Sequence, residues 1–167
     1  MSEILNKISS YNIFNYLFPG AIFSILAERL GLLDAPHEII EKLIWFYFVG
    51  MVLSRLGSIA VEPLLRRISF VTYSQYQDYL LACEADPKIE VMVESSNTYR
   101  TIATAFLILL AGSAFPFVFD LSGSERDWQT VISLSILMAI FMVSFRKQAK
   151  YISQRVDFCK RNLDDHH

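Results

Sequence analysis

Charged residues are scarce in this sequence. Of its 167 residues, 19% are Asp, Glu, Lys or Arg and 53% are hydrophobic, whereas a soluble domain is about 25% charged and about 45–50% apolar. This composition is typical of a membrane protein. The formal net charge of −2 gives no reason to expect direct binding of nucleic acid by the chain.

Cysteine and histidine are also rare. Cys83 and Cys159 form no CxxC pair, which argues against a disulfide framework and a zinc module. The histidines are His37, His166 and His167, and the sequence contains no HExxH, GxSxG, P-loop or GxGxxG motif. We therefore expect no catalytic residues, no metal site and no cofactor, and we interpret the chain as non-enzymatic.

What the sequence does contain is a set of long apolar runs. A helix needs roughly 20 residues, within a range of about 17–25, to cross the hydrocarbon core of a bilayer. Helices of a soluble bundle would carry charges along one face, and these runs do not. We predict an all-α integral membrane protein with four transmembrane helices. The runs are Tyr11–Ala27, Leu43–Val61 with Arg55 inside it, Thr101–Phe119 and Trp128–Phe145.

The distribution of basic residues predicts the orientation of these helices. If all four runs span, both termini and residues 62–100 share one side. Together with Arg55 at the nearby end of the second run, that side holds twelve of the fifteen Lys and Arg residues. Basic residues favour the cytoplasmic side. We expect two antiparallel hairpins in a bacterial inner membrane, with cytoplasmic N and C termini.

This topology divides the chain into four parts: a first hairpin (1–62), a cytoplasmic helical excursion (63–100), a second hairpin (101–145) and a basic cytoplasmic tail (146–167). Asp86 and Pro87 are predicted to be the N-cap and the first residue of a helix that runs without interruption into the third span. The second and fourth spans are expected to extend into the cytoplasm over 63–69 and 146–160. Pro19-Gly20 and Pro116 are expected to kink their helices.

The excursion and the tail offer candidate docking residues for a soluble cytoplasmic protein. Tyr73, Tyr76, Leu80 and Cys83 recur at the spacing of one helix face. Exposed aromatic residues favour protein interfaces, although we prefer packing against the neighbouring helix and tail for the individual tyrosines. The candidates for docking are Tyr73, Tyr76, Tyr79, Arg146, Lys147, Lys150 and Arg155.

Small residues line one side of the second span. Gly50, Ser54, Gly57 and Ser58 have a spacing that allows close approach of a neighbouring helix. The alternative is ordinary packing within one subunit. Because the third span contains a second group of small residues, we favour a homo-oligomer.

Arg55 is the charge that lies deepest in a predicted span. Its seven-residue offset from Glu62 places both on one face of an α-helix, where they could pair within the membrane. The alternative is that Arg55 extends to the inner headgroups.

The layout resembles the membrane subunit of the Kiwa antiphage system, in architecture only. The resemblance implies an oligomeric membrane sensor that controls a cytoplasmic partner. We therefore expect a subunit that senses a membrane event and relays it in antiphage defence. A small ion channel or membrane-permeabilising effector, and a membrane scaffold, are the alternatives.

Overall fold

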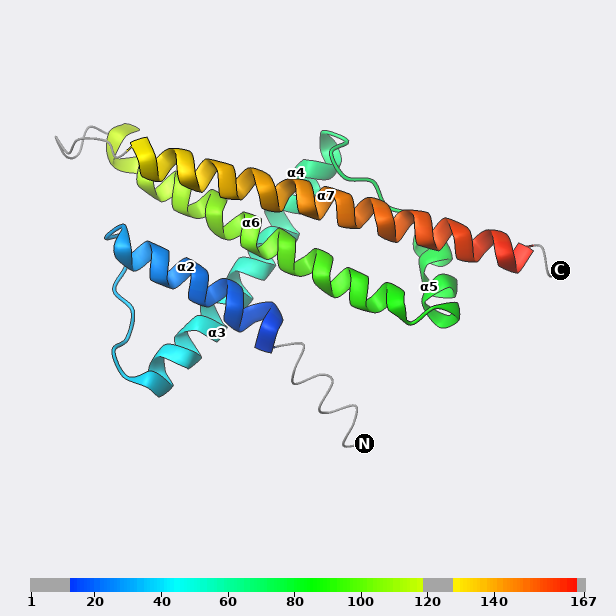
Figure 1. Cartoon of the computed structure of the whole chain (residues 1–167), viewed down its shortest axis with the longest axis horizontal. Coiled ribbons are helices and arrows are strands. Elements are labelled where there is room, and N and C mark those ends of the chain that lie inside the picture. Colours follow the sequence, from blue (N-terminus) through cyan, green and yellow to red (C-terminus); the bar gives the residue numbers. More distant parts are fainter. Residues whose placement is uncertain (1–12, 119–127, 165–167) are drawn as a thin grey trace.

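A computed structural model describes the backbone of residues 13–118 and 128–164, and the side chains of residues 15–113 and 128–162. Every regular element within these ranges is a helix, which confirms the predicted all-α class (Figure 1). Asn12 and the side chain of Pro116 lie outside the described residues. The elements are η1 (Ile13–Leu17), α2 (Phe18–Arg29), α3 (Ile39–Leu56), η2 (Gly57–Val61), α4 (Glu62–Arg67), α5 (Tyr76–Ala85), α6 (Lys88–Val118) and α7 (Trp128–Asp164), of which η1 and η2 are π-helical turns.

Helix α2 ends because Gly31 adopts a left-handed conformation. Its φ is +65°, a value that glycine reaches without steric cost. The amide of Gly31 donates to the carbonyl of Glu28 at 3.0 Å, and the amide of Leu32 donates to that of Ala27 at 2.9 Å. These two bonds form a Schellman motif. The chain then returns toward α3.

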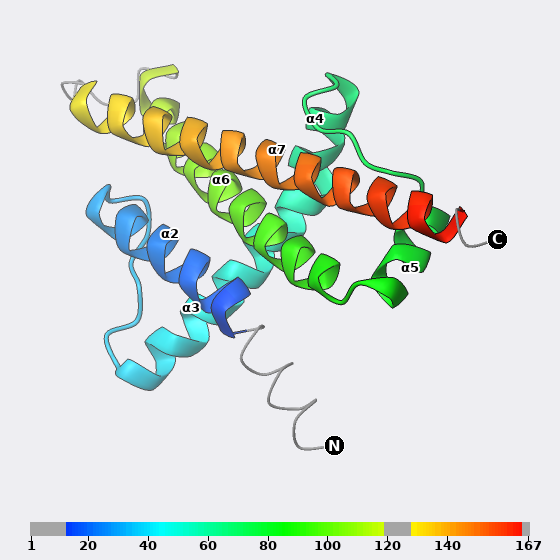
Figure 2. The ribbon, with the colours of Figure 1, turned by 45° about the vertical axis from the view of Figure 1, so that its right-hand side comes forward.

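Helices α2 and α3 cross at two glycines (Figures 1 and 2). A Cβ on Gly20 would overlap the carbonyl oxygen of Phe46, and a Cβ on Gly50 would overlap that of Tyr16. Glycine at both positions is therefore required for the backbones to approach this closely. The rings of Tyr16 and Tyr47 meet edge to face beside the crossing, with their centroids 5.6 Å apart.

Helix α3 continues through η2 into α4, so one helical segment extends from Ile39 to Arg67. Ser69, two residues after the helix, adopts a φ of 56° in the left-handed region, which stops the helix from continuing. The amide of Phe70 donates to the carbonyl of Leu65 at 2.9 Å, which closes the turn. The predicted extension of the second span beyond Val61 is confirmed as a helix.

Helix α6 begins at the predicted cap. The side chain of Asp86 accepts a hydrogen bond of 3.1 Å from the amide of Lys88, and Pro87 occupies the first turn. The helix then runs for 31 residues without a break, and α7 runs for 37. The predicted continuous helices are confirmed in both cases.

Helices α6 and α7 lie side by side along the molecule (Figures 1 and 2). Three apolar clusters follow their length. One packs α2 against α6 and α7 around Ile102, Phe106 and Leu109. A second joins α4 to α7 through Leu65 and Phe145, and a third joins α5, α6 and α7 through Ala82, Ile89 and Val156.

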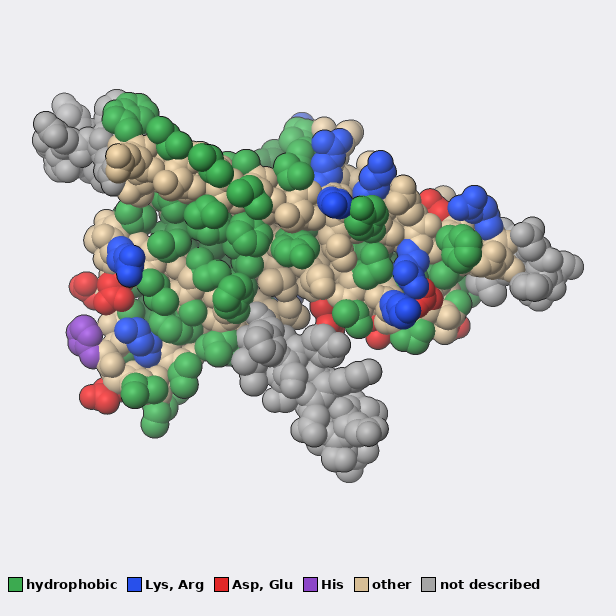
Figure 3. All heavy atoms as spheres, in the orientation of Figure 1, with side chains coloured by type: hydrophobic (Ala, Val, Ile, Leu, Met, Phe, Trp, Pro, Cys, Tyr) green, Lys and Arg blue, Asp and Glu red, His purple; other side chains and the backbone are tan. Residues whose placement is uncertain are grey.

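Much of the apolar surface is not covered by the chain itself. Two helical segments, Ile39–Arg67 and Trp128–Asn162, are long and apolar enough to cross a bilayer by length and composition. Only 33% and 11% of their most apolar windows are buried, whereas a core helix of a soluble protein would be mostly buried. In Figure 3, hydrophobic side chains cover α2, the second half of α6 and the first half of α7, and basic side chains gather over the second half of α7.

These two segments include the second and fourth predicted spans. Spanning by the first and third runs is not shown, so the four-span topology stays a prediction. The α2–α3 connection and the start of α7 lie at one end of the molecule, and α5 and the last residues of α7 lie at the other (Figure 1). Below, the second of these ends is called the stalk (residues 68–96 and 146–164).

Candidate functional site

A cavity of about 570 Å³ opens where the stalk meets the apolar part of the molecule. Residues from α4, α5, α6, α7 and the segment between α4 and α5 line it. Its wall combines two arginines, one carboxylate, three tyrosines and several small polar side chains with an apolar side. The apolar side is made by Val93, Ile152 and Val156.

The central interaction in this wall is an ion pair between Glu62 and Arg100. Glu62 opens α4 directly after the π-helical turn, and Arg100 lies midway along α6. The guanidinium group donates to the carboxylate, and both side chains are largely buried, with 10% and 19% exposed for Arg100 and Glu62. The Nε of Arg100 is also buried and makes no hydrogen bond within the described part of the chain.

Arg55 does not take part in this pair. The seven-residue offset places Arg55 and Glu62 on one face only in an unbroken α-helix, and η2 lies between them. A π-helical turn contains an additional residue, so it rotates Glu62 away from Arg55 and toward α6. Arg55 is exposed. The pairing of Glu62 with Arg55 is therefore corrected to a pairing with Arg100.

Gly57 provides the space that Arg100 occupies. A Cβ built on Gly57 would lie 2.8 Å from Oγ1 of Thr104 and 3.5 Å from Cγ and Nε of Arg100. Thr104 in turn donates to the carbonyl of Arg100 at 2.8 Å. The small residue at 57 thus allows α6 to bring its arginine against the π-helical turn.

The small residues that were predicted to form one seam on the second span contact different elements of the same chain. Gly50 contacts η1, and Gly57 contacts α6, so both are used within one chain rather than between copies. Ser54 is half-buried and Ser58 is exposed. For Gly50 and Gly57 the alternative of ordinary packing is correct, and they give no evidence for an oligomer.

Tyr73 connects the ion pair to the surface of the molecule. Burial, together with the negative charge of Glu62 and a hydrogen bond to it, raises the pKa of the Tyr73 phenol far above its ordinary value of 10. The guanidinium carbon of Arg66 lies 5.3 Å from the centre of the Tyr73 ring. The Tyr73 hydroxyl therefore donates to the Glu62 carboxylate and extends the ion pair by one hydrogen bond.

The tyrosines do not form the single helix face that their spacing predicted. Tyr73 precedes α5, which begins at Tyr76. Tyr76 is exposed, whereas Tyr79 packs against the cluster around Ala82. Burial and a hydrogen bond with Cys83 raise the pKa of Tyr79 to about 12. The face of α5 that packs against α7 is therefore Tyr79, Ala82 and Cys83.

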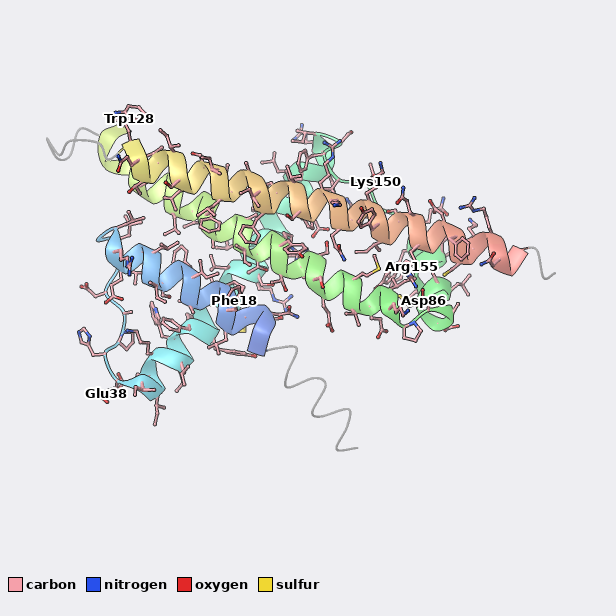
Figure 4. All side chains as sticks on the ribbon, in the orientation of Figure 1. Phe18, Glu38, Asp86, Trp128, Lys150 and Arg155 are labelled. Carbon is pink, nitrogen blue, oxygen red and sulfur yellow. The ribbon has the colours of Figure 1, made fainter. Side chains whose placement is uncertain are left out.

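A second cavity of about 770 Å³ lies along the stalk between the start of α6 and the last turns of α7. Its wall includes Tyr151, Phe158 and the ion pair of Arg155 with Asp86. These two charged side chains point toward one another (Figure 4). The hydrogen bond from Arg155 lowers the pKa of the Asp86 carboxyl below its ordinary value of 3.8.

The other basic docking candidates lie on the outside of α7. Arg146 is placed over the ring of Phe70, 4.9 Å from its centre, and Lys147 lies 5.6 Å from the ring centre of Tyr151. Lys150 is exposed and points outward from α7 (Figure 4). Arg155 is already paired, so Arg146, Lys147 and Lys150 form the basic surface that the structure leaves accessible.

The chemistry of the 570 Å³ cavity is that of binding. Among the described residues, no group of three His, Cys, Asp or Glu side chains is placed to hold a metal ion. The wall instead presents hydrogen-bond donors from Arg66, Ser96 and Asn97. Such a wall favours recognition of a polar ligand.

Sequence reasoning missed the role of Arg100 and Gly20. Arg100 was grouped with the charges of the cytoplasmic excursion because it directly precedes an uncharged run. Gly20 was interpreted only as part of a kink, since the partner backbone that it contacts lies 26 or more residues away. Comparisons with protein families, curated proteins and solved structures find no match to this chain.

Proposed function

We propose that this chain is a multi-pass protein of a bacterial inner membrane that relays a membrane event to a soluble cytoplasmic partner. The proposal includes four spans, cytoplasmic termini and a non-enzymatic role in antiphage defence. The observation that carries it is the character of α7, which is one continuous helix with an uncovered apolar half and a packed stalk half.

The apolar half of α7 has the surface of a lipid-facing helix. Its exposed large side chains include Ile132, Ile136, Ile140 and Val143, which recur every three or four residues along one face. Exposed apolar side chains cover α3 in the same way, among them Ile40, Ile44 and Phe48. A bilayer removes this surface from water, and a second copy of the chain within the bilayer could cover part of it.

The stalk half supports the relay. In α7, Ala149, Ile152 and Val156 are buried against α4, α5 and α6. A displacement of the apolar half would therefore move the packed stalk, because both belong to one helix. The exposed side chains of Tyr151 and Phe158 are available there for a partner.

The interior contacts favour the relay over the channel alternative. The hydroxyl groups of Thr101 and Thr104 donate to carbonyls of α6 itself at 2.8 Å. Both residues are buried. Internally satisfied hydroxyls are typical of a packed interior rather than of a path for water or ions.

Membrane extraction and phage challenge test the two halves of the proposal. The full-length chain is expected to remain with bacterial membranes after alkaline carbonate extraction, and recovery in the supernatant would exclude a spanning protein.

In cells that carry the chain with its neighbouring genes, Phe158→Asp should abolish protection from phage while leaving membrane retention unchanged. Glu84→Gln, at another exposed stalk position, serves as the control. Full protection by the Phe158 variant would reject the stalk as the relay surface.

A further inference from the structure

The cavity at the base of the stalk has the size of a ligand site. Its volume of about 570 Å³ lies within the range of about 300–1,000 Å³ that such sites occupy. Five separate segments converge on it, so its shape depends on the tertiary fold. The ion pair of Glu62 with Arg100 holds α4 against α6 at its wall.

The neutral groups in the wall are rich in donors. Gln75 and Asn97 line the cavity and carry amide groups that can donate hydrogen bonds. Ser96 is buried and presents a hydroxyl group to the same space. These groups can donate to an anion without first losing a proton.

The charges in the wall leave a positive surplus. Glu62 and Arg100 neutralise one another, and Arg66 remains as an exposed cation above the Tyr73 ring. Asp157, outside the lining, accepts a hydrogen bond of 3.5 Å from Ser74 and is exposed to solvent, so its charge is screened.

We propose that this cavity binds a phosphate ester, with the phosphate held by the guanidinium of Arg66. A guanidinium matches the oxygen geometry of phosphate, and hydrogen bonds to a charged group are the stronger ones. The apolar side formed by Val93, Ile152 and Val156 accommodates the organic part of the ester. The ester comes either from a soluble metabolite or from a lipid headgroup, and both present the same chemistry.

Binding to the purified full-length protein tests this proposal. In detergent the probes are inorganic phosphate and glycerol 3-phosphate, followed by calorimetry, with equal concentrations of chloride as the blank. In nanodiscs the probe is phosphatidylglycerol, compared with phosphatidylcholine alone and followed by native mass spectrometry. Arg66→Gln removes the proposed contact. Arg67→Gln is the matched control, since Arg67 is the adjacent exposed cation and is outside the cavity lining.

Arg66→Gln is expected to weaken binding by at least about tenfold, given the strength of hydrogen bonds to charged groups. Arg67→Gln should bind like the parent. Arg66-dependent binding of glycerol 3-phosphate identifies a soluble source, and Arg66-dependent retention of phosphatidylglycerol alone identifies a lipid source. Equal losses in the two arginine variants, or no binding of any probe, would overturn the proposal. Because the detergent arm requires no particular topology, its failure is distinct from failure of the relay proposal.

Discussion

At the scale of single residues, the negative charge of Glu62 is balanced by Arg100, which lies 38 positions later in the chain. Both side chains are mostly removed from solvent. Removing one partner of a buried ion pair leaves the other charge uncompensated, at a cost of about 3–5 kcal/mol. The stability of the junction between α4 and α6 should therefore depend strongly on each partner.

Glu62→Gln should lower the free energy of unfolding by about 3–5 kcal/mol, because it leaves the Arg100 cation buried without its carboxylate. Adding Arg100→Met should restore part of the loss, since the double variant buries no unpaired charge. Unfolding of the purified protein in mixed detergent measures both effects.

Arg55→Gln is the control for this pair. The Arg55 side chain is exposed, so its replacement should change the free energy of unfolding by no more than about 0.5 kcal/mol. Arg55 would regain a structural role if its variant were as unstable as Glu62→Gln. That result would also contradict the pairing of Glu62 with Arg100.

At the scale of helices, the crossing of α2 and α3 depends on backbone contact at Gly20 and Gly50. A methyl group at either position would overlap a carbonyl oxygen, which does not move as a side chain can. Gly50→Ala should therefore cost about 1–3 kcal/mol or more, as overpacking does. A lower melting temperature in detergent would report this loss.

Gly112→Ala is the matched control for the crossing. The methyl group would meet the end of the flexible Leu32 side chain at 3.0 Å, and that side chain can shift. The substitution also favours the helix, because Ala has a higher helix propensity than Gly. Equal losses of stability in the Gly50 and Gly112 variants would contradict a crossing made by backbone contact.

Acid should destabilise the stalk, because it protonates Asp86. Its pKa is lowered in the folded chain by Arg155, so the ionised carboxylate stabilises the fold. This stabilisation is fully present above the ordinary pKa of 3.8 and is lost as the pH falls through the lower folded value. The difference in melting temperature between the parent and Asp86→Asn should be constant above about pH 5 and shrink below about pH 4. A difference that is the same at all pH values would show that the charge does not contribute.

The helices themselves could be predicted well because their signals are local. The cap at Asp86 and the absence of glycine before α6 enters its apolar run are visible in the sequence, and both appear in the fold. The π-helical turn at Gly57–Val61 is followed by Pro63, which has no N–H to donate to the carbonyl of Ile59, so this distortion also has a local signal that we did not use. That turn redirects Glu62, so the ion pair at the candidate site could not be inferred from helical spacing alone.

At the scale of the whole molecule, one end is apolar on its outside and the other is polar and packed on its inside. Hydrophobic side chains cover α2, the second half of α6 and the first half of α7, and basic side chains lie over the second half of α7 (Figure 3). An uncovered apolar surface of this kind is costly in water. The fold therefore favours a bilayer around the first half and water around the second.

Topology reporters test this arrangement most directly. One reporter is fused after Lys160, in the last turns of α7, and another is inserted at 122–124, between α6 and α7. We predict that the first is active only as a cytoplasmic probe and the second only as a periplasmic probe. Both reporters active on the same side, or each active on the opposite side, would contradict the proposed orientation and the relay to a cytoplasmic partner.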